Sequence, residues 1–280
     1  MKKIILAIVI CLISTFIIIK YVETKDLQGT MIYYLRDKDG VYASYLDKGA
    51  FFNFPSELSN LFYDDEGTTI LGSMNDAIFS YDEANLIGAV YNKLVVYDYK
   101  NKLVIHEIPV NIEKSVSNIK TAPNGKFISY VEGETLKIWN THDEILTKVD
   151  FGTTHYDWYD SQTLISNKSG NIELYDVLEA RTYKSNFSIN GDFLDLSADK
   201  TTILCRVNSN FVRIENIIAK EILDVKVDSN RDCAISPDGK FIAYLTPRIF
   251  TKFAKDLIIV NLKGKRVHKI GNCSSISDWK

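Results

Sequence analysis

A short stretch near the middle of the chain has residue types that could bind or react with a polar ligand. His155 and Asp157 lie within Thr153–Asp157, and Arg231 and Asp232 occupy the equivalent place in a later segment of similar sequence. An imidazole close to carboxylates can relay a proton, and the same groups can hold a polar ligand. The alternative, which we favour, is that these residues are solvated in loops or hydrogen-bond to neighbouring segments.

The other histidines stand singly, at His106, His142 and His268. His106 and His268 fall in alternating apolar patterns, where we expect surface or hydrogen-bonded histidines. The sequence has no Gly-x-Ser-x-Gly elbow, phosphate loop, dinucleotide fingerprint, His-Glu-x-x-His motif or EF-hand loop. We therefore predict no catalytic, cofactor-binding or metal-binding residue, and no cofactor. The alternative is an enzyme, such as a glycan lyase or hydrolase, whose acid and base come from distant loops.

Four cysteines are present, and Cys11 lies in an apolar N-terminal segment. The remaining three, Cys205, Cys233 and Cys273, are odd in number and have no Cys-x-x-Cys spacing. This pattern indicates neither a disulfide framework nor a zinc site. We expect buried free thiols. A single bridge between Cys233 and Cys273 is the alternative, because equivalent strands of neighbouring repeats can lie side by side.

The charge pattern argues against nucleic acid as a partner. The formal net charge is −3, and no block of Lys and Arg is long enough to follow a phosphate backbone. One segment, 247–255, is both basic and aromatic, which suits a protein partner or an anionic membrane surface. A hairpin extension with its phenylalanines folded back is the interpretation that we favour there. The residues concerned are Arg248, Phe250, Lys252, Phe253 and Lys255.

The N-terminus predicts a membrane anchor. Two lysines in residues 1–3 precede the apolar run Ile4–Ile19, which ends at Lys20. This order directs a segment into the membrane with its N-terminus in the cytoplasm. The run is not followed by small residues suited to signal-peptide cleavage, so we favour an uncleaved single-pass anchor over residues 4–22, with a cleaved signal peptide as the alternative. Residues 23–29 are then a polar linker, and residues 30–280 a body on the extracytoplasmic side of the cell membrane.

A repeated motif organises the body of the chain. Ser236–Tyr244 (Ser-Pro-Asp-Gly-Lys-Phe-Ile-Ala-Tyr) returns almost unaltered as Ala122–Tyr130. Each copy predicts a tight turn that leads into a half-buried strand, because turn residues are followed directly by alternating apolar ones. The copies lie 114 residues apart, which is three steps of 38, and weaker copies at Tyr156–Ile165 and Asp195–Leu204 fill the intermediate steps.

A second pattern follows each copy of the motif: an alternating strand that ends in Asn or Asp. It occurs at Thr135–Asn140, Asn171–Asp176, Asn210–Asn216 and Asp256–Asn261. With one further short strand, the unit has four strands in about 38 residues, which is typical of a β-propeller. The Ser236–Tyr244 motif resembles the repeat of the TolB-like family of bacterial propellers, distant relatives of WD-repeat proteins. The resemblance implies a fold and not an activity, because such propellers act as scaffolds, receptors and enzyme appendages.

The two ends of the body complement each other. Ser274–Lys280 matches the strand that precedes a Pro-Asp-Gly turn, with Trp279 in the place of Ile235, but no second strand follows it. Met31–Arg36 has the pattern of a second strand with no first strand before it. We therefore expect the C-terminal strand to lie beside Met31, complete the first blade and close the ring, which removes exposed sheet edges.

The number of blades is expected to be six. Second strands fall near residues 32, 69, 126, 163, 201 and 240. The longer interval between residues 69 and 126 contains segments 78–90, 93–98 and 102–108, which together form a nearly complete blade. Seven blades are therefore the alternative.

The sequence thus predicts an all-β fold, a single propeller of four-stranded blades preceded by one transmembrane helix. We predict a membrane-anchored, extracytoplasmic scaffold that binds a protein or cell-surface partner without catalysis. Its N-terminal helix gives it the membrane as a second partner. The sequence predicts no specific ligand-binding residue beyond the loop positions considered above.

Overall fold

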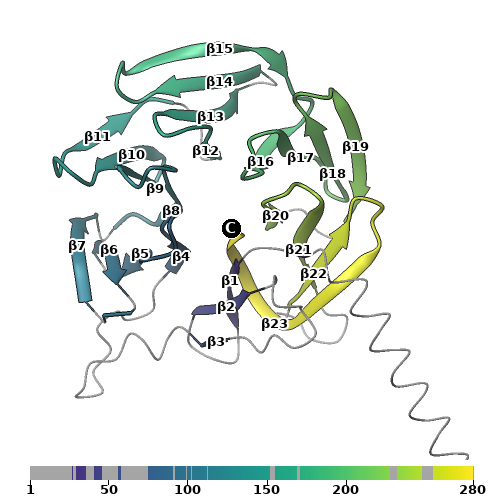
Figure 1. The fold of residues 1–280 in the computed structure, drawn as a ribbon, viewed down its shortest axis with the longest axis horizontal. Helices are drawn as coiled ribbons and strands as arrows, with labels where there is room; N and C mark the ends of the chain where they lie inside the picture. The colour runs from purple at the N-terminus through teal and green to yellow at the C-terminus, as the bar shows by residue number, and fades with distance from the viewer. Residues whose placement is uncertain are drawn as a thin grey trace, which may run out of the picture.

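The computed structural model describes residues 27, 30–35, 41–45, 56–57, 75–90, 92–98, 100–101, 103–111, 113–151, 155–168, 171–227, 232–247 and 255–279. All regular secondary structure in these residues is β-strand, and the sheets are arranged around a common centre (Figure 1). The predicted all-β fold is confirmed for these ranges. The predicted anchor, residues 4–22, lies outside them, and within them no helix is long and apolar enough to cross a membrane.

Four sheets contain four antiparallel strands each, and in each the first strand lies nearest the centre (Figure 1). The first sheet has β4 (Asn75–Phe79), β5 (Leu86–Val90), β6 (Lys93–Asp98) and β7 (Leu103–Pro109). The second has β8 (Val116–Thr121), β9 (Phe127–Glu132), β10 (Thr135–Asn140) and β11 (Leu146–Val149). The third has β12 (Tyr156–Trp158), β13 (Thr163–Lys168), β14 (Asn171–Asp176) and β15 (Arg181–Ser188). The fourth has β16 (Asp192–Leu196), β17 (Thr202–Asn208), β18 (Phe211–Asn216) and β19 (Glu221–Lys226).

A further sheet joins the two ends of the chain. Its strands, in spatial order, are β20 (Cys233–Ile235), β21 (Phe241–Pro247), β22 (Lys255–Asn261), β23 (Arg266–Trp279), β1 (Thr30–Leu35), β2 (Val41–Tyr45) and β3 (Ser56–Glu57). The first part of β23 pairs with β22, and its second part pairs with β1, with Trp279 opposite Met31. The predicted position of the C-terminal strand beside Met31 is confirmed by this register. Counting β20–β23, five blades have the predicted four strands.

The blade β4–β7 occupies the long interval between the predicted second strands near residues 69 and 126. It is complete, with β5 rather than a strand near residue 69 in the second position. The expectation of a strand near residue 69 lies outside the described residues.

The Pro-Asp-Gly turn has the local geometry that its sequence predicts. The N–H of Gly239 donates to the carbonyl of Ser236 at 2.9 Å, and Gly239 has a φ of +70°, which side-chain-bearing residues rarely adopt. The Ser236 hydroxyl donates to Asp238 at 2.7 Å and accepts from the N–H of Phe241 at 2.9 Å. These bonds lead the chain directly into β21.

Turns that follow the third strand of a blade lie beside turns that follow the first strand. The N–H of Thr141 donates to the carbonyl of Lys126, and that of Ile217 donates to Thr201, both at 2.9 Å. Both kinds of turn therefore lie on one face of the molecule. We call it the turn face; it carries turns 122–126, 159–162, 197–201 and 236–240.

The core lies between neighbouring blades, where the faces of adjacent sheets pack together. One cluster combines side chains of β9 and β10 with those of β12, β13 and β14. In it the rings of Phe127 and Trp158 are stacked, with centroids 5.8 Å apart. The indole N–H of Trp158 donates to the Ser129 hydroxyl at 2.9 Å. This contact satisfies a buried polar group and fixes one blade against the next.

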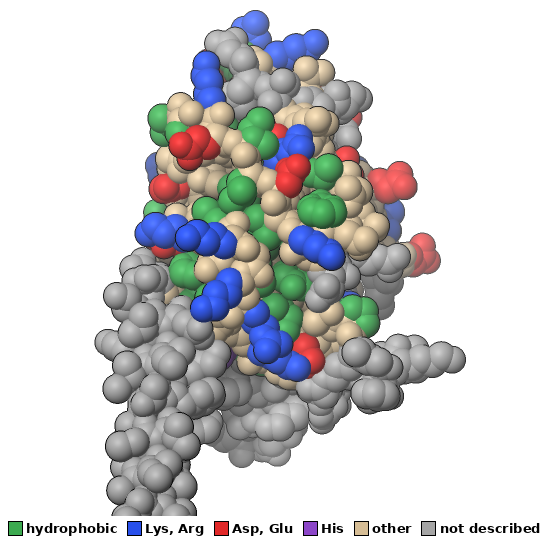
Figure 2. Space-filling view, turned by 90° about the vertical axis from the view of Figure 1, so that its right-hand side faces the viewer, with side chains coloured by type: hydrophobic (Ala, Val, Ile, Leu, Met, Phe, Trp, Pro, Cys, Tyr) green, Lys and Arg blue, Asp and Glu red, His purple; other side chains and the backbone are tan. Residues whose placement is uncertain are grey.

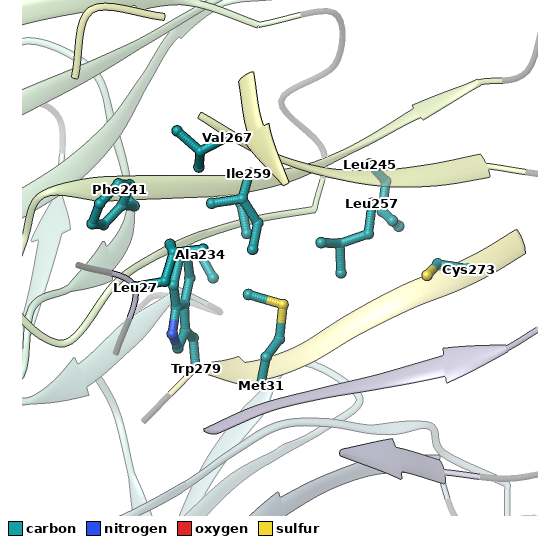
Figure 3. Close-up of a cluster of buried hydrophobic side chains, with 11 residues drawn as sticks. Leu27, Met31, Ala234, Phe241, Leu245, Leu257, Ile259, Val267, Cys273 and Trp279 are labelled. Atoms are coloured by element: carbon teal, nitrogen blue, oxygen red, sulfur yellow. The ribbon is translucent and has the colours of Figure 1, made fainter. Parts of the chain in front are cut away.

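A second cluster joins the two ends of the chain (Figure 3). Trp279 and Met31 lie there beside Leu27, Ala234 and Phe241. Leu27 falls within the predicted polar linker 23–29, yet its side chain is buried. Burial of an aliphatic side chain of this size contributes roughly 1.5–3 kcal/mol. The packed body therefore includes Leu27, whereas the other residues of the predicted linker lie outside the described ranges.

The three cysteines of the body are free thiols, as expected. Cys205 and Cys273 are buried and Cys233 is half-buried. The alternative bridge between Cys233 and Cys273 is not formed.

Candidate functional site

Three consecutive innermost strands place one charged residue each at the same position. Lys120 on β8, Asp157 on β12 and Asp195 on β16 all lie two residues before the first residue of a turn on the turn face. Their side chains are largely buried, with 18%, 13% and 12% of the surface exposed. The repeat thus aligns three charges near the common centre of the sheets.

These charges form a network across blades. The ammonium of Lys120 lies 3.2 Å from an oxygen of Asp157 and 3.5 Å from one of Asp195. The other oxygen of Asp195 accepts the N–H of Ile235 on β20 at 3.0 Å. Four consecutive innermost strands are therefore linked. Because partly buried charges need partners, this network also fixes the relative positions of the blades.

The electrostatics of the network hold Asp157 ionised. Burial by itself would raise the pKa of Asp157, but the positive charges of Lys120 and Lys200 and the hydrogen bond from the N–H of Trp158 outweigh it. The pKa of Asp157 consequently lies below its usual value. The group is a carboxylate at neutral pH and is a poor proton donor there.

A hollow of about 210 Å³ opens above the network on the turn face. We call it the mouth hollow. Its lining includes the charged side chains of Lys120, Asp157, Asp195 and Lys200, together with Trp279. It can accept a small polar or charged side chain from a ligand.

A larger hollow of about 400 Å³ lies between the blades β4–β7 and β8–β11. We call it the blade groove. Tyr81 and Ile105 line it from one blade, and Pro123 and Ile128 from the other. Tyr81 and Pro123 line the mouth hollow as well, so the two spaces are adjacent.

The predicted polar loop residues are not all brought together. Asp157 belongs to the network, whereas Asp232 precedes β20 and pairs with Lys255 at 3.3 Å. His155 precedes β12, its side chain is exposed, and its carbonyl accepts the Ser166 hydroxyl at 2.7 Å. Partial desolvation and the charge of Arg206 lower the pKa of His155. Arg231 lies outside the described residues.

The predicted basic and aromatic segment is described only at its ends. Pro247 ends β21 and Lys255 begins β22. The ammonium of Lys255 pairs with Asp232 and donates to the carbonyl of Ser274 at 3.4 Å. Lys255 therefore connects strands of its own sheet. Arg248, Phe250, Lys252 and Phe253 lie outside the described residues.

The three solitary histidines lie in different sheets or the turns between their strands. His106 on β7 meets the ring of Trp139 edge-on, with centroids 4.9 Å apart, and lies 3.8 Å from Glu144. His142 is exposed in the turn before β11, and His268 lies on β23. Within the described ranges, no group of three or more His, Cys, Asp or Glu side chains is arranged to hold a metal ion.

Sequence reasoning missed Lys120 and Asp195 as site residues. A signal was available, because both occupy the repeat position of Asp157. Placing the three residues in one column of the repeat would have marked them as neighbours around the centre. Their ion pairs span 37 and 75 residues of sequence. No local pattern predicts contacts of that range.

The network also bears on catalysis. Asp157 and Asp195 each have an oxygen within 3.5 Å of the same ammonium. Their separation therefore falls below the roughly 10 Å upper limit for a glycosidase pair. However, Lys120 lies between them, and the low pKa of Asp157 is the opposite of what a general acid requires. The arrangement is better suited to holding a ligand than to transferring a proton.

Comparison with known proteins identifies the fold. No protein-family model matches the sequence, and no curated protein is significantly similar to it. The structure of TolB from Acinetobacter baumannii is similar with a TM-score of 0.62 and 15% identity, over 90% of this chain and 66% of that one. This likeness confirms the predicted TolB-like β-propeller fold.

Two further solved structures are similar over smaller parts of the chain. Kuenenia stuttgartiensis hydrazine synthase matches with a TM-score of 0.48 and 16% identity, over 74% of this chain and 69% of that one. The β-propeller domain of Cps50 (Swd1) from Myceliophteria thermophila matches with a TM-score of 0.48 and 11% identity, over 67% of this chain and 65% of that one.

Proposed function

We propose that this protein is a membrane-anchored, extracytoplasmic β-propeller that binds a protein partner on its turn face and carries out no reaction. The observation that supports this most strongly is the pair of adjacent hollows on that face, of which the mouth hollow is lined by Lys120, Asp157 and Asp195. Binding sites are concave, with an apolar lining and a few fixed polar groups. The mouth hollow and the blade groove have both features.

We further infer a ring of six blades closed by the C-terminal strand. The second part of β23 with β1, β2 and β3 forms a four-stranded unit of its own, in addition to the five blades described above. Because β23 pairs with β22 and with β1, it joins the last blade to the first. The complete blade β4–β7 accounts for the long interval in the repeat. A closed ring leaves no blade without a neighbour.

The membrane arrangement rests on the sequence of residues 1–22. Leu27 is buried in the body, so few residues separate the proposed anchor from the propeller. A short connection would keep the propeller close to the bilayer. Proteinase K added to intact spheroplasts should digest the body, whereas a cytoplasmic body would be digested only after lysis and would overturn this localisation.

Site-directed photocrosslinking tests the binding site. The crosslinking amino acid p-benzoylphenylalanine is placed at Tyr81, whose side chain is 57% exposed at the junction of the two hollows. In native membranes we expect a discrete protein adduct at this position. The same amino acid at Ile222, which is exposed on the outermost strand β19, is the matched control and should give no such adduct. Equal labelling at both positions, or no adduct at Tyr81, would contradict the proposal.

One observation favours an enzymatic alternative, namely the close approach of Asp157 and Asp195. A glycan lyase or hydrolase would lose turnover in Asp157→Asn while keeping its fold. If panels of soluble glycans give no product with the unmodified protein, the binding function stands alone. Turnover that disappears in this variant, with stability intact, would overturn the non-catalytic assignment.

A further inference from the structure

The blade groove has the dimensions of a site for an extended chain. It begins at the mouth hollow, where Tyr81, Thr121 and Pro123 line both spaces. It ends at Ile105 and His106 on β7, the outermost strand of its blade. Three strand spacings of roughly 4.8 Å separate the first and last strands of a blade, so the path is about 14 Å long. An extended peptide of about four to five residues covers that distance.

Exposed apolar side chains lie at both ends of the groove, with Tyr81 57% exposed at the mouth and Ile105 43% exposed at the outer end. Between them the lining is also apolar, but its residues Ile87, Val96 and Ile128 are buried. Apolar groups gathered in a concave space gain free energy when a ligand removes them from water. By contrast, the exposed residues Ile218 and Ile222 lie in the turn before β19 and on β19, the outermost strand of its blade. On the side of the molecule that Figure 2 shows, Lys and Arg are dispersed among hydrophobic groups. The groove is therefore the better candidate for docking.

Polar groups that suit a peptide backbone flank this apolar surface. The amide side chains of Asn85 and Asn124 and the hydroxyl of Thr141 belong to the lining. The loops that carry them are fixed locally. Asn124 accepts the N–H of Lys126 at 3.0 Å, and the Thr141 hydroxyl lies 3.2 Å from two backbone carbonyls of turn 122–126. A preorganised groove loses little entropy when a ligand binds.

The charges along the path favour a basic ligand. Among the described lining residues of the two hollows, four have carboxylates and two have ammonium groups. The carboxylates are Asp82, Glu83, Asp157 and Asp195, and the ammonium groups are Lys120 and Lys200. Complementary charge steers association and selects partners. The same negative excess repels an anionic lipid surface.

From this geometry we propose that the blade groove and the mouth hollow bind an extended peptide segment with aliphatic and basic side chains. One aliphatic side chain packs against Ile105 at the outer end of the groove, and a Lys or Arg side chain lies past Tyr81 towards the carboxylates at the mouth. The inference rests on the proposed function in taking the partner to be a protein. It adds the chemical class of the segment that is recognised and the path on which it lies.

Peptide selection tests this inference directly. Phage-displayed random dodecapeptides are panned on the full-length protein in nanodiscs of zwitterionic lipid, and selected peptides are measured by fluorescence polarisation. We expect enrichment of sequences in which an aliphatic residue and a Lys or Arg lie within about five residues. Replacing that Lys or Arg by Glu should weaken binding by about tenfold or more, and added salt should weaken the original peptide.

Groove variants then locate the peptide. Ile105→Asp and Tyr81→Ala, both at exposed positions, should each weaken binding by about tenfold or more, the range of a truncated interface anchor. Leu178→Asp is the matched control, because Leu178 is exposed in the turn before β15 on another blade, and it should leave the affinity unchanged. Thermal unfolding of each variant shows whether the fold is kept, and Tyr81→Ala serves if Ile105→Asp is unstable.

Several results would overturn the inference. Selected peptides without a basic residue, or peptides whose affinity is unchanged by both groove variants, would show that the segment or the path is wrong. Self-association of the protein that is abolished by Ile105→Asp would assign the groove to a second copy of this chain. If one of these results is found but Tyr81 still crosslinks to a protein in membranes, the proposed function stands and only this inference is removed. If a peptide binds specifically in the groove but no crosslink forms in membranes, this inference stands and the proposed function is removed.

Discussion

Replacing Trp279 tests how much the junction of the chain ends contributes to stability. Its side chain is 6% exposed and lies in the cluster with Leu27, Met31 and Phe241. Truncating a buried tryptophan to alanine costs about 3–5 kcal/mol through lost burial and the cavity left behind. For a domain of this size each kcal/mol lowers the melting temperature by roughly 2–4 °C. Trp279→Ala should therefore melt roughly 6–20 °C below the unmodified protein.

Deleting residues 275–280 removes more than one side chain. It takes away the partners that face β1 from Met31 to Tyr34, as well as Trp279. The loss exposes an edge of β1 and unseats the packing around Leu27. The expected total exceeds that of Trp279→Ala and approaches the whole stability of an ordinary domain, about 5–15 kcal/mol. Exposed strand edges then lead to aggregation.

Circular dichroism during heating and size-exclusion chromatography with light scattering measure both effects. Leu178→Ala, at an exposed turn, is the control and should change stability by less than about 0.5 kcal/mol. If the truncated chain is monomeric and melts with the full-length protein, the C-terminal strand does not close the ring. If Trp279→Ala melts at the temperature of the unmodified protein while the truncated chain does not, the cluster around Met31 contributes less to stability than its burial indicates.

Four further predictions concern single residues. Lys120→Met leaves two partly buried carboxylates without their bridging ammonium and should lower the free energy of unfolding in urea by about 1–3 kcal/mol, between the values for exposed and buried ion pairs. The pKa of Asp157 is lower in the folded protein than in the unfolded chain, so its contribution is complete above about pH 4 and is lost as the pH falls below that value. In Asp157→Asn the free energy of unfolding in urea should therefore depend less on pH in the acid range. A pH dependence equal to that of the unmodified protein would contradict this prediction. A Cβ on Gly191, whose φ is +151°, would lie 2.5 Å from the backbone oxygen of Arg206, so Gly191→Ala should cost at least about 1–3 kcal/mol in thermal unfolding. Burial raises the pKa of the Cys233 thiol to about 12, so we expect a maleimide to label it at neutral pH only after unfolding, as mass spectrometry would show.

The fold could be predicted to a large extent because its signals are local. The turn at Ser236–Lys240 is specified by its own residues, which satisfy its hydrogen bonds within the turn. Strand alternation and the step of 38 residues then predicted four-stranded units, and the structure has them. Even the pairing of Met31 with Trp279 followed from an incomplete repeat at each end. These inferences needed only short-range chemistry and the spacing of its copies.

The site was less accessible to sequence reasoning because its contacts cross blades. Asp157 was singled out, but its partner Lys120 was not, and Asp232 lies in a separate ion pair. The sequence also did not predict the burial of Leu27, because a mostly polar segment with a single leucine is typical of a linker. Each of these outcomes depends on which residues of different repeats meet in space.

The sequence alone determined the repeating four-stranded unit of this protein, with its turns, its strands and their spacing. Those features arise from backbone preferences and hydrogen bonds within a few residues, so they persist in any copy of the repeat. The tertiary structure decided which residues of different blades meet. Only when the blades are packed side by side do Lys120, Asp157 and Asp195 share one space, and only then does a groove open between the blades β4–β7 and β8–β11.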